Sequence, residues 1–122
     1  MINGNLEQFI DTGWFTEATL YLNGFVYWCE AQYDVEKHEN HFFVNKWRAI
    51  NENDLSYHTI ITDDGEPLEW ECVFETYDSD LDVIKKRFLE ARIFEGNTFW
   101  QVESVLAWLD EGAPIMESPE SK

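Results

Sequence analysis

The dipeptide Asn23-Gly24 is the sequence feature that most constrains the fold of this chain. It separates two runs, Thr16–Leu22 and Phe25–Tyr33, that are rich in β-branched and aromatic residues. Asn-Gly readily adopts the two positive φ angles of a type I′ turn, and this turn joins adjacent antiparallel strands. The sequence therefore predicts a β-hairpin over residues 16–33.

Three further segments extend the strand pattern. His41–Ile50 and Leu68–Tyr77 alternate in side-chain type, and Ser56–Thr62 is a shorter run of the same kind. The polar segments Asp34–Asn40 and Asp63–Pro67 separate strands and are predicted to form a loop and a tight turn. Because every connection is short, the simplest arrangement is an antiparallel meander of four or five strands.

Helical spacing is found on both sides of these strands. Asn3–Asp11 predicts a short N-terminal helix, and apolar residues recur at helical intervals from Leu81 to Ala91, with Ser79 as the expected N-cap. Thr98 and Gln101 have the spacing of a capping box for a final helix. The predicted apolar stripe of that helix is Phe99, Val102, Val105, Leu106 and Leu109.

These elements predict an α+β fold, with an antiparallel four- to five-stranded β-meander, a short N-terminal helix and two C-terminal helices packed on one face. The 122 residues fit a single domain. We expect residues 1–114 to form this domain and residues 115–122 to be a disordered tail. The other face of the sheet would be left open to water or to a partner.

The net charge of −17, from 25 acidic and 8 basic residues, narrows the range of partners. Phosphates would be repelled, so direct binding to nucleic acid or to an anionic membrane is disfavoured. A basic protein would instead be attracted at a raised association rate. The 6 Trp, 5 Tyr and 9 Phe argue against a disordered chain and suit either a core or a binding face.

The two cysteines do not form a disulfide framework. Cys29 and Cys72 both lie in strand-like apolar runs, so two buried thiols are expected. The N-terminal segment has no basic region or apolar run of signal length, and no stretch approaches 18 apolar residues. We therefore expect a cytoplasmic protein that does not bind a membrane.

Acidic residues are concentrated in the second half of the predicted sheet. The same part of the sequence, between Ala49 and Ile84, has no Lys or Arg to balance them. Alternation places the carboxylates of the last predicted strand on one face and its apolar side chains, with Cys72, on the other. The acidic residues of this strand, of the preceding turn and of the following segment are Glu69, Glu71 and Glu75; Asp63, Asp64 and Glu66; and Asp78, Asp80 and Asp82. We expect them to form one acidic field.

Two interpretations of this field remain open. It could be a solvated face that prevents edge-to-edge aggregation, with Lys46 and Arg48 pairing to it across strands. It could also hold a basic partner. Like charges at this density destabilise the fold, and this cost favours a functional use for them. Alternation places Trp28 on the same strand face as Glu30, and Tyr77 on the same face as Glu71 and Glu75. Aromatic rings among the carboxylates would add cation–π contacts. The predicted partner-binding residues are Asp63, Asp64, Glu66, Glu69, Glu71, Glu75, Trp28 and Tyr77.

Catalytic signals are weak in this sequence. His38 and His41, near two glutamates, are spaced as zinc ligands on a helix would be, but they fall at a loop entering a strand. A nucleophilic pair of Cys29 or Cys72 with His58 has no local support. Phosphate-binding loops, dinucleotide turns, G-x-S-x-G and C-x-x-C motifs are all missing from the sequence. We predict no enzyme activity, no metal and no cofactor.

The sequence most favours a small inhibitory binding protein of the immunity type, which neutralises a basic, nuclease-like toxin by covering its active or substrate-binding surface. One alternative is a nucleic-acid mimic from a mobile element, of the antirestriction or anti-CRISPR type, whose carboxylates would form two rows. Another is a ligand-binding module or enzyme with an aromatic-lined cavity. The oligomeric state stays open, because Trp100 and Trp108 could close the core or form a dimer contact.

Overall fold

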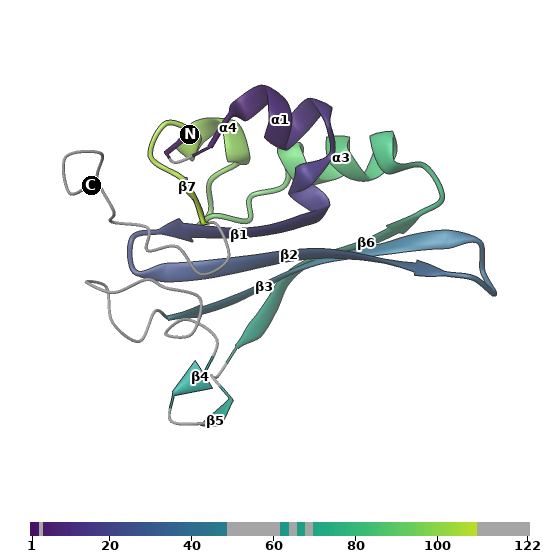
Figure 1. Ribbon diagram of the computed structural model, residues 1–122, viewed down its shortest axis with the longest axis horizontal. Coiled ribbons are helices and arrows are strands. Elements are labelled where there is room, and N and C mark those ends of the chain that lie inside the picture. Colours follow the sequence, from purple (N-terminus) through teal and green to yellow (C-terminus); the bar gives the residue numbers. More distant parts are fainter. Residues whose placement is uncertain (3, 49–61, 64–65, 68–69, 110–122) are drawn as a thin grey trace.

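A five-stranded antiparallel sheet with helices on one face forms the body of the molecule, as the computed structural model in Figure 1 shows. The structure describes residues 1–2, 4–48, 62–63, 66–67 and 70–109. The strands of the main sheet are β1 (Glu17–Leu22), β2 (Phe25–Asp34), β3 (Glu39–Arg48), β6 (Glu71–Asp78) and β7 (Ala107–Leu109). Their spatial order is β6-β3-β2-β1-β7. The predicted α+β class is confirmed.

Four short helical segments and a small second sheet complete the described structure. The helical segments are α1 (Leu6–Asp11), the 3₁₀ turn η1 (Trp14–Thr16), α3 (Leu81–Glu90) and α4 (Phe99–Val102). The strands β4 (Thr62–Asp63) and β5 (Glu66–Pro67) pair antiparallel, as expected for the tight turn predicted there. In the part of the chain that is described, no helix is both long and apolar enough to cross a membrane.

The hairpin predicted from Asn23-Gly24 is confirmed. These two residues have φ angles of 50° and 88°, and Leu22 pairs directly with Phe25 across the turn. The next connection is shorter than the predicted loop, since β3 already begins at Glu39. The side chain of Asp34 accepts hydrogen bonds from the backbone of the following residues and so closes this second turn.

The C-terminal part of the prediction is wrong beyond α4. The capping box of Thr98 and Gln101 is present, but the helix that it starts ends at Val102. The chain then turns and Ala107–Leu109 pairs with β1 as the fifth strand. A short apolar run is compatible with the spacing of a helix and with that of a strand, and Ala107–Leu109 forms a strand. Of the predicted strand Ser56–Thr62, only Thr62 is among the described residues. The predicted tail at residues 115–122 lies outside them.

The helix after β6 is confirmed with a different N-cap. The side chain of Asp80, and not that of Ser79, accepts a hydrogen bond from the backbone of Asp82. Asp80 carries a charge that also favours the positive end of the helix dipole. The helix buries Ile84 and Phe88 against the sheet.

The main core lies between the helices and the sheet, and aromatic rings fill much of it. Phe9 stacks on Phe99 with ring centroids 5.6 Å apart, and Phe42 meets Phe88 edge-on at 5.6 Å. Trp108 packs against the same cluster, whereas Trp100 is exposed, so of these two rings only Trp108 closes the core. A smaller buried cluster lies on the opposite face of the sheet and consists of Val26, Trp47, Ala107 and Leu109.

A register shift between β3 and β6 changes which side chains share a face. Val44 pairs with Phe74, but the next residue, Asn45, pairs with Cys72, so Val73 is an extra residue in β6. A one-residue shift moves the following side chains to the other face. Glu71 therefore lies opposite Lys46 on the helix side of the sheet. The expectation of a second buried thiol is also wrong, since Cys72 is exposed while Cys29 is buried.

Candidate functional site

Three carboxylates lie in one row across the face of the sheet that is turned away from the helices, which we call the outer face. Phe43 of β3 is paired with Glu30 of β2 on one side and with Glu75 of β6 on the other, and Glu30 is paired with Glu17 of β1. Neighbouring strands are about 4.8 Å apart, so Glu30 and Glu75 are about 10 Å apart at the backbone. We call Glu17, Glu30 and Glu75 the acidic row.

Neighbouring side chains on β2 hold the carboxylate of Glu30. Trp28 Nε1 donates to Glu30 Oε1 at 3.0 Å, and Gln32 Nε2 donates to Glu30 Oε2 at 2.6 Å. All three side chains fall on the outer face because they alternate with Tyr27, Cys29 and Ala31 along the strand. Each oxygen keeps a lone pair free for a further donor.

Glu75 is held in a similar way at the other side of Phe43. His41 Nε2 and Tyr77 Oη lie 2.8 Å and 3.4 Å from Glu75 Oε2. The rings of His41 and Tyr77 stack with centroids 4.3 Å apart and an interplanar angle of 8°. Desolvation, with a further contribution from Glu75, raises the pKa of Tyr77, so its hydroxyl remains a donor to the carboxylate.

The basic residues of β3 do not neutralise the acidic row. Lys46 and Arg48 lie on the helix side, where Lys46 Nζ is 4.2 Å from the ring centroid of Phe25 and 3.7 Å from Glu95 Oε2. Arg48 Cζ is 4.8 Å from the same ring. Within the described ranges, the acidic row forms no ion pair with Lys or Arg. The expected pairing of these two bases with the carboxylates therefore does not reach the acidic row, although Lys46 lies across from Glu71 in the register.

The structure unites some of the predicted partner-binding residues and separates others. Trp28, Glu75 and Tyr77 share the outer face. Glu71 does not share a face with Glu75, because the extra residue Val73 lies between them. The prediction of a single acidic field is therefore wrong for this strand.

The remaining predicted residues belong to the turn before β6. Asp63 and Glu66 are a paired position of the small β4–β5 sheet. Asp64 and Glu69 lie outside the described residues.

The residues that sequence reasoning missed are Glu17, His41, Phe43 and Glu30. Alternation along β2 and β3 was read correctly, but the row becomes visible only when the register between strands is known.

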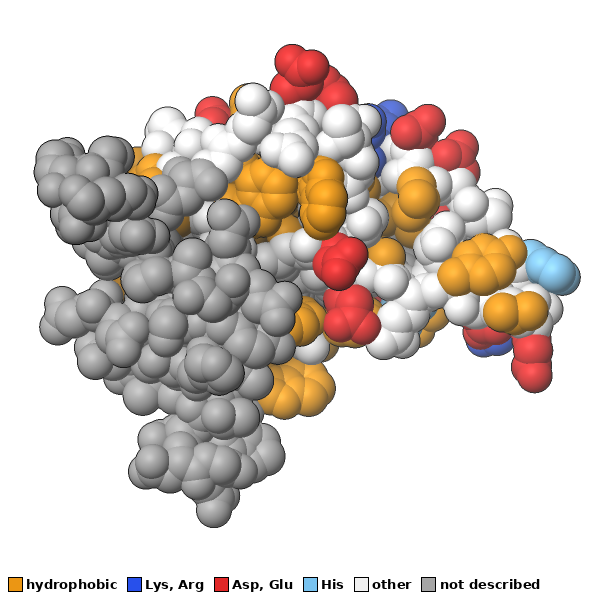
Figure 2. All heavy atoms as spheres, viewed as in Figure 1, with side chains coloured by type: hydrophobic (Ala, Val, Ile, Leu, Met, Phe, Trp, Pro, Cys, Tyr) orange, Lys and Arg blue, Asp and Glu red, His pale blue; other side chains and the backbone are white. Residues whose placement is uncertain are grey.

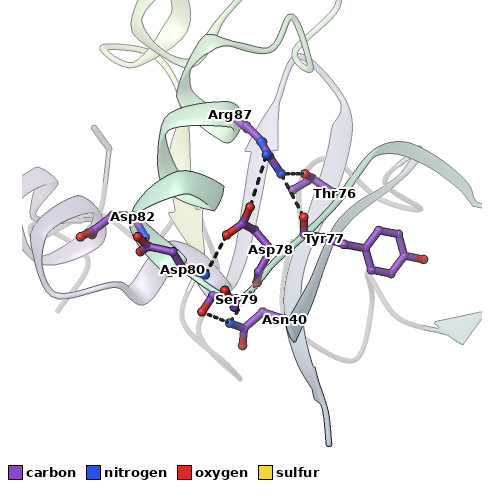
Figure 3. Close-up of polar contacts among 8 residues, drawn as sticks. All are labelled: Asn40, Thr76, Tyr77, Asp78, Ser79, Asp80, Asp82 and Arg87. Carbon is purple, nitrogen blue, oxygen red and sulfur yellow. Dashed lines mark hydrogen bonds and ion pairs between the residues drawn. The ribbon is translucent and has the colours of Figure 1, made fainter. Parts of the chain in front are cut away.

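The acidic residues after β6 are engaged in local structure, as Figure 3 shows. Arg87 donates to Thr76 Oγ1 and to the Tyr77 carbonyl, and pairs with Asp78 Oδ2 at 3.4 Å. Asp78 Oδ1 accepts from the backbone of Asp80. These contacts hold the connection between β6 and α3, while the Tyr77 ring points away from them.

No catalytic arrangement is formed by the candidates from the sequence that the structure describes. Among those residues, no three His, Cys, Asp or Glu side chains form a group that could hold a metal ion. Burial raises the pKa of the Cys29 thiol well above its ordinary value, which disfavours the nucleophilic thiolate. Its proposed partner, His58, lies outside the described residues.

The comparisons with family models, with curated proteins and with solved structures find no match to this chain.

Proposed function

We propose that this protein is an acidic inhibitory binding protein of the immunity type, which covers the basic active or substrate-binding surface of a toxin such as a nuclease. One observation carries the proposal: Glu30 and Glu75 flank Phe43 on the outer face, and no described Lys or Arg pairs with them. A site of this kind offers two fixed negative charges and an aromatic face between them.

The proposed mechanism is occlusion. Lys and Arg side chains that a nuclease uses to hold phosphates would pair with the acidic row instead. A guanidinium above Phe43 would gain a cation–π contact as well. Because donors on Trp28, Gln32, His41 and Tyr77 already orient the carboxylates, little side-chain entropy would be lost on binding. The net charge of −17 would raise the rate of encounter.

One observation favours this function over a ligand-binding module or enzyme with a cavity. The ring contacts between helices and sheet, such as that of Phe88 on α3 with Phe42 on β3 at 5.6 Å, support a filled core over a ligand cavity. The free thiol of Cys72 on the surface fits the cytoplasm, which we propose as the setting.

An affinity capture from the source cell, with elution in a salt gradient, tests the proposal. The bait would be the wild type, the variant Glu30→Gln/Glu75→Gln, and the control Glu7→Gln/Asp11→Asn, which removes the same charge from exposed positions of α1. We expect one basic protein that the wild type and the control retain to high salt and that the first variant releases early. That protein should lose its toxic activity when the wild type is added. Equal retention by all three baits would reject the proposed site.

A further inference from the structure

Three rings gather around Glu75 on the outer face of the sheet. His41 and Tyr77 stack with centroids 4.3 Å apart, and the ring of Phe43 lies 5.1 Å from that of His41 at an angle of 46°. His41 is paired with Tyr77, and Phe43 is paired with Glu75, so these four side chains occupy adjacent positions on β3 and β6. We call the rings of His41, Phe43 and Tyr77 the ring surface.

Solvent reaches both the ring surface and the carboxylate beside it. Tyr77 is 46% exposed, Phe43 is partly exposed, and the side chain of Glu75 is 49% exposed. His41 Nε2 and Tyr77 Oη both lie within hydrogen-bond distance of Glu75 Oε2. Among the described residues no donor reaches Glu75 Oε1, so this oxygen can accept a hydrogen bond from a partner.

The chain itself fills an arrangement of the same kind on the helix side of the sheet. Lys46 Nζ lies 4.2 Å from the ring centroid of Phe25 and 3.7 Å from Glu95 Oε2, so one cation contacts an aromatic face and a carboxylate together. On the outer face, Phe43 and Glu75 offer the same two groups, and no Lys or Arg of the described ranges lies over Phe43. The cation for the outer arrangement can therefore come from a partner.

Charge and shape indicate which cation fits. The chain carries a net charge of −17, and Figure 2 shows that acidic side chains outnumber basic ones on the face in view. A second copy of the chain would meet like charges, so a basic protein is the favoured occupant. Arginine suits the ring surface better than lysine, because a planar guanidinium stacks on an aromatic face and holds its donors in a fixed fork, whereas an ammonium is a strongly hydrated point charge.

We infer that the ring surface binds an arginine side chain of the basic partner, whose guanidinium lies on Phe43 and donates to Glu75 Oε1. This inference rests on the proposed function, because it names the type of residue that the partner places at the acidic row. The remaining N–H groups of the guanidinium are directed toward Glu30, whose strand lies on the other side of Phe43. The site thus selects arginine, and not positive charge alone.

Two peptides of equal length and charge test the inference, one of alternating Gly and Arg and one of alternating Gly and Lys. We expect the wild type to bind the Gly/Arg peptide about fivefold more tightly at low ionic strength, which is the effect of one stacked guanidinium, as measured by titration calorimetry. Phe43→Leu keeps an apolar side chain but removes the ring, so it should bring the two affinities to within about twofold of each other.

The matched control is Tyr33→Leu, which removes an exposed ring from the helix side of the same sheet. It should keep the preference for the Gly/Arg peptide. A second measurement uses the wild type alone: in NMR titrations, the Gly/Arg peptide should shift the amide signals of Phe43 and Glu75 and leave those of α1 in place.

Equal affinity of the wild type for the two peptides would overturn the inference, as would a preference that persists in Phe43→Leu or disappears in Tyr33→Leu. Unshifted amide signals at Phe43 and Glu75 would overturn it as well. Each of these results leaves the proposed function standing, since a basic partner could still be held by charge alone. If neither peptide binds, the inference fails, and the salt-gradient capture with Glu30→Gln/Glu75→Gln decides separately on the proposed function.

Discussion

Glu30 and Glu75 lie on opposite sides of Phe43 in one row of paired residues on the outer face of the sheet. They belong to strands that are not neighbours, and their spacing is fixed by the strand between them. Each is also held by hydrogen bonds from residues on its own strand. The sheet thus presents two charges at a set distance, with an aromatic ring between them.

Replacement of Gly4 by Ala should destabilise the fold, because Gly4 lies directly against Trp108. A Cβ atom at this position would be 2.5 Å from Trp108 Cε3 and 3.0 Å from Trp108 Cβ. The ring cannot move freely, since its edge packs on Phe9 with centroids 5.2 Å apart. We expect Gly4→Ala to lower the free energy of unfolding by about 1 to 3 kcal/mol in urea titrations.

The double variant Gly4→Ala/Trp108→Leu is the control for that prediction. A leucine at position 108 removes the 2.5 Å contact with Cε3 and leaves the 3.0 Å contact with Cβ, so Gly4→Ala should cost much less in this background. If the two substitutions were additive, the close approach of Gly4 to Trp108 would not be the cause.

The two thiols should differ in reactivity. Cys29 is buried, and burial raises its pKa, whereas Cys72 is exposed on β6. A disulfide reagent should therefore modify one thiol per native molecule and two per unfolded molecule. Cys72→Ser should abolish the reaction of the native protein. Rapid modification of native Cys72→Ser would contradict the position of Cys29 in the core.

Stability should fall at alkaline pH because of Tyr27. Burial, and secondarily the Glu95 carboxylate, raises the pKa of Tyr27 above its ordinary value of about 10. Above that pH the unfolded chain releases the proton while the folded protein keeps it. The free energy of unfolding should then fall by up to about 1.4 kcal/mol per pH unit from this group.

Tyr27→Phe tests the assignment. Its unfolding free energy should decline less steeply between about pH 10 and pH 11. At pH 7 the variant should be as stable as the wild type or up to about 1 kcal/mol more stable, since the buried hydroxyl has no hydrogen-bond partner in the described part of the chain. Parallel pH profiles for the two proteins would exclude Tyr27 as the cause.

Arg87 should stabilise the connection between β6 and α3 that supports Tyr77. It bonds to three groups of the connecting region, and its side chain is partly exposed. We expect Arg87→Ala to lower the free energy of unfolding by about 1 kcal/mol. Arg87→Lys should recover only part of this loss, because an ammonium lacks the planar fork of the guanidinium. Lys86→Ala, an exposed change of equal charge on the same helix, should have little effect.

The parts of the fold that depend on local signals could be predicted from the sequence. Asn23-Gly24 specifies its turn through its own backbone preferences, and Thr98 with Gln101 specifies the start of α4. The extent of α4 could not be predicted, because the strand Ala107–Leu109 exists only through its pairing with β1.

The candidate site was less predictable for a similar reason. Alternation placed Trp28 with Glu30 and Tyr77 with Glu75, and both placements are confirmed. The extra residue Val73 has no distinct sequence signal, yet it moves Glu71 to the other side of the sheet. The row around Phe43 depends on how residues of neighbouring strands are paired. This register cannot be read from the sequence of a single strand.

The central claim is that the outer carboxylates hold a basic partner, and titration calorimetry with the captured partner tests it most directly. We expect Glu30→Gln/Glu75→Gln to weaken binding at least about 100-fold, because truncating charge pairs at an interface costs several kcal/mol. Glu7→Gln/Asp11→Asn should change the affinity less than about threefold, and the partner's activity should return in proportion to the loss of binding. Equal weakening by both variants would mean that only net charge matters, and would contradict a binding site at the acidic row.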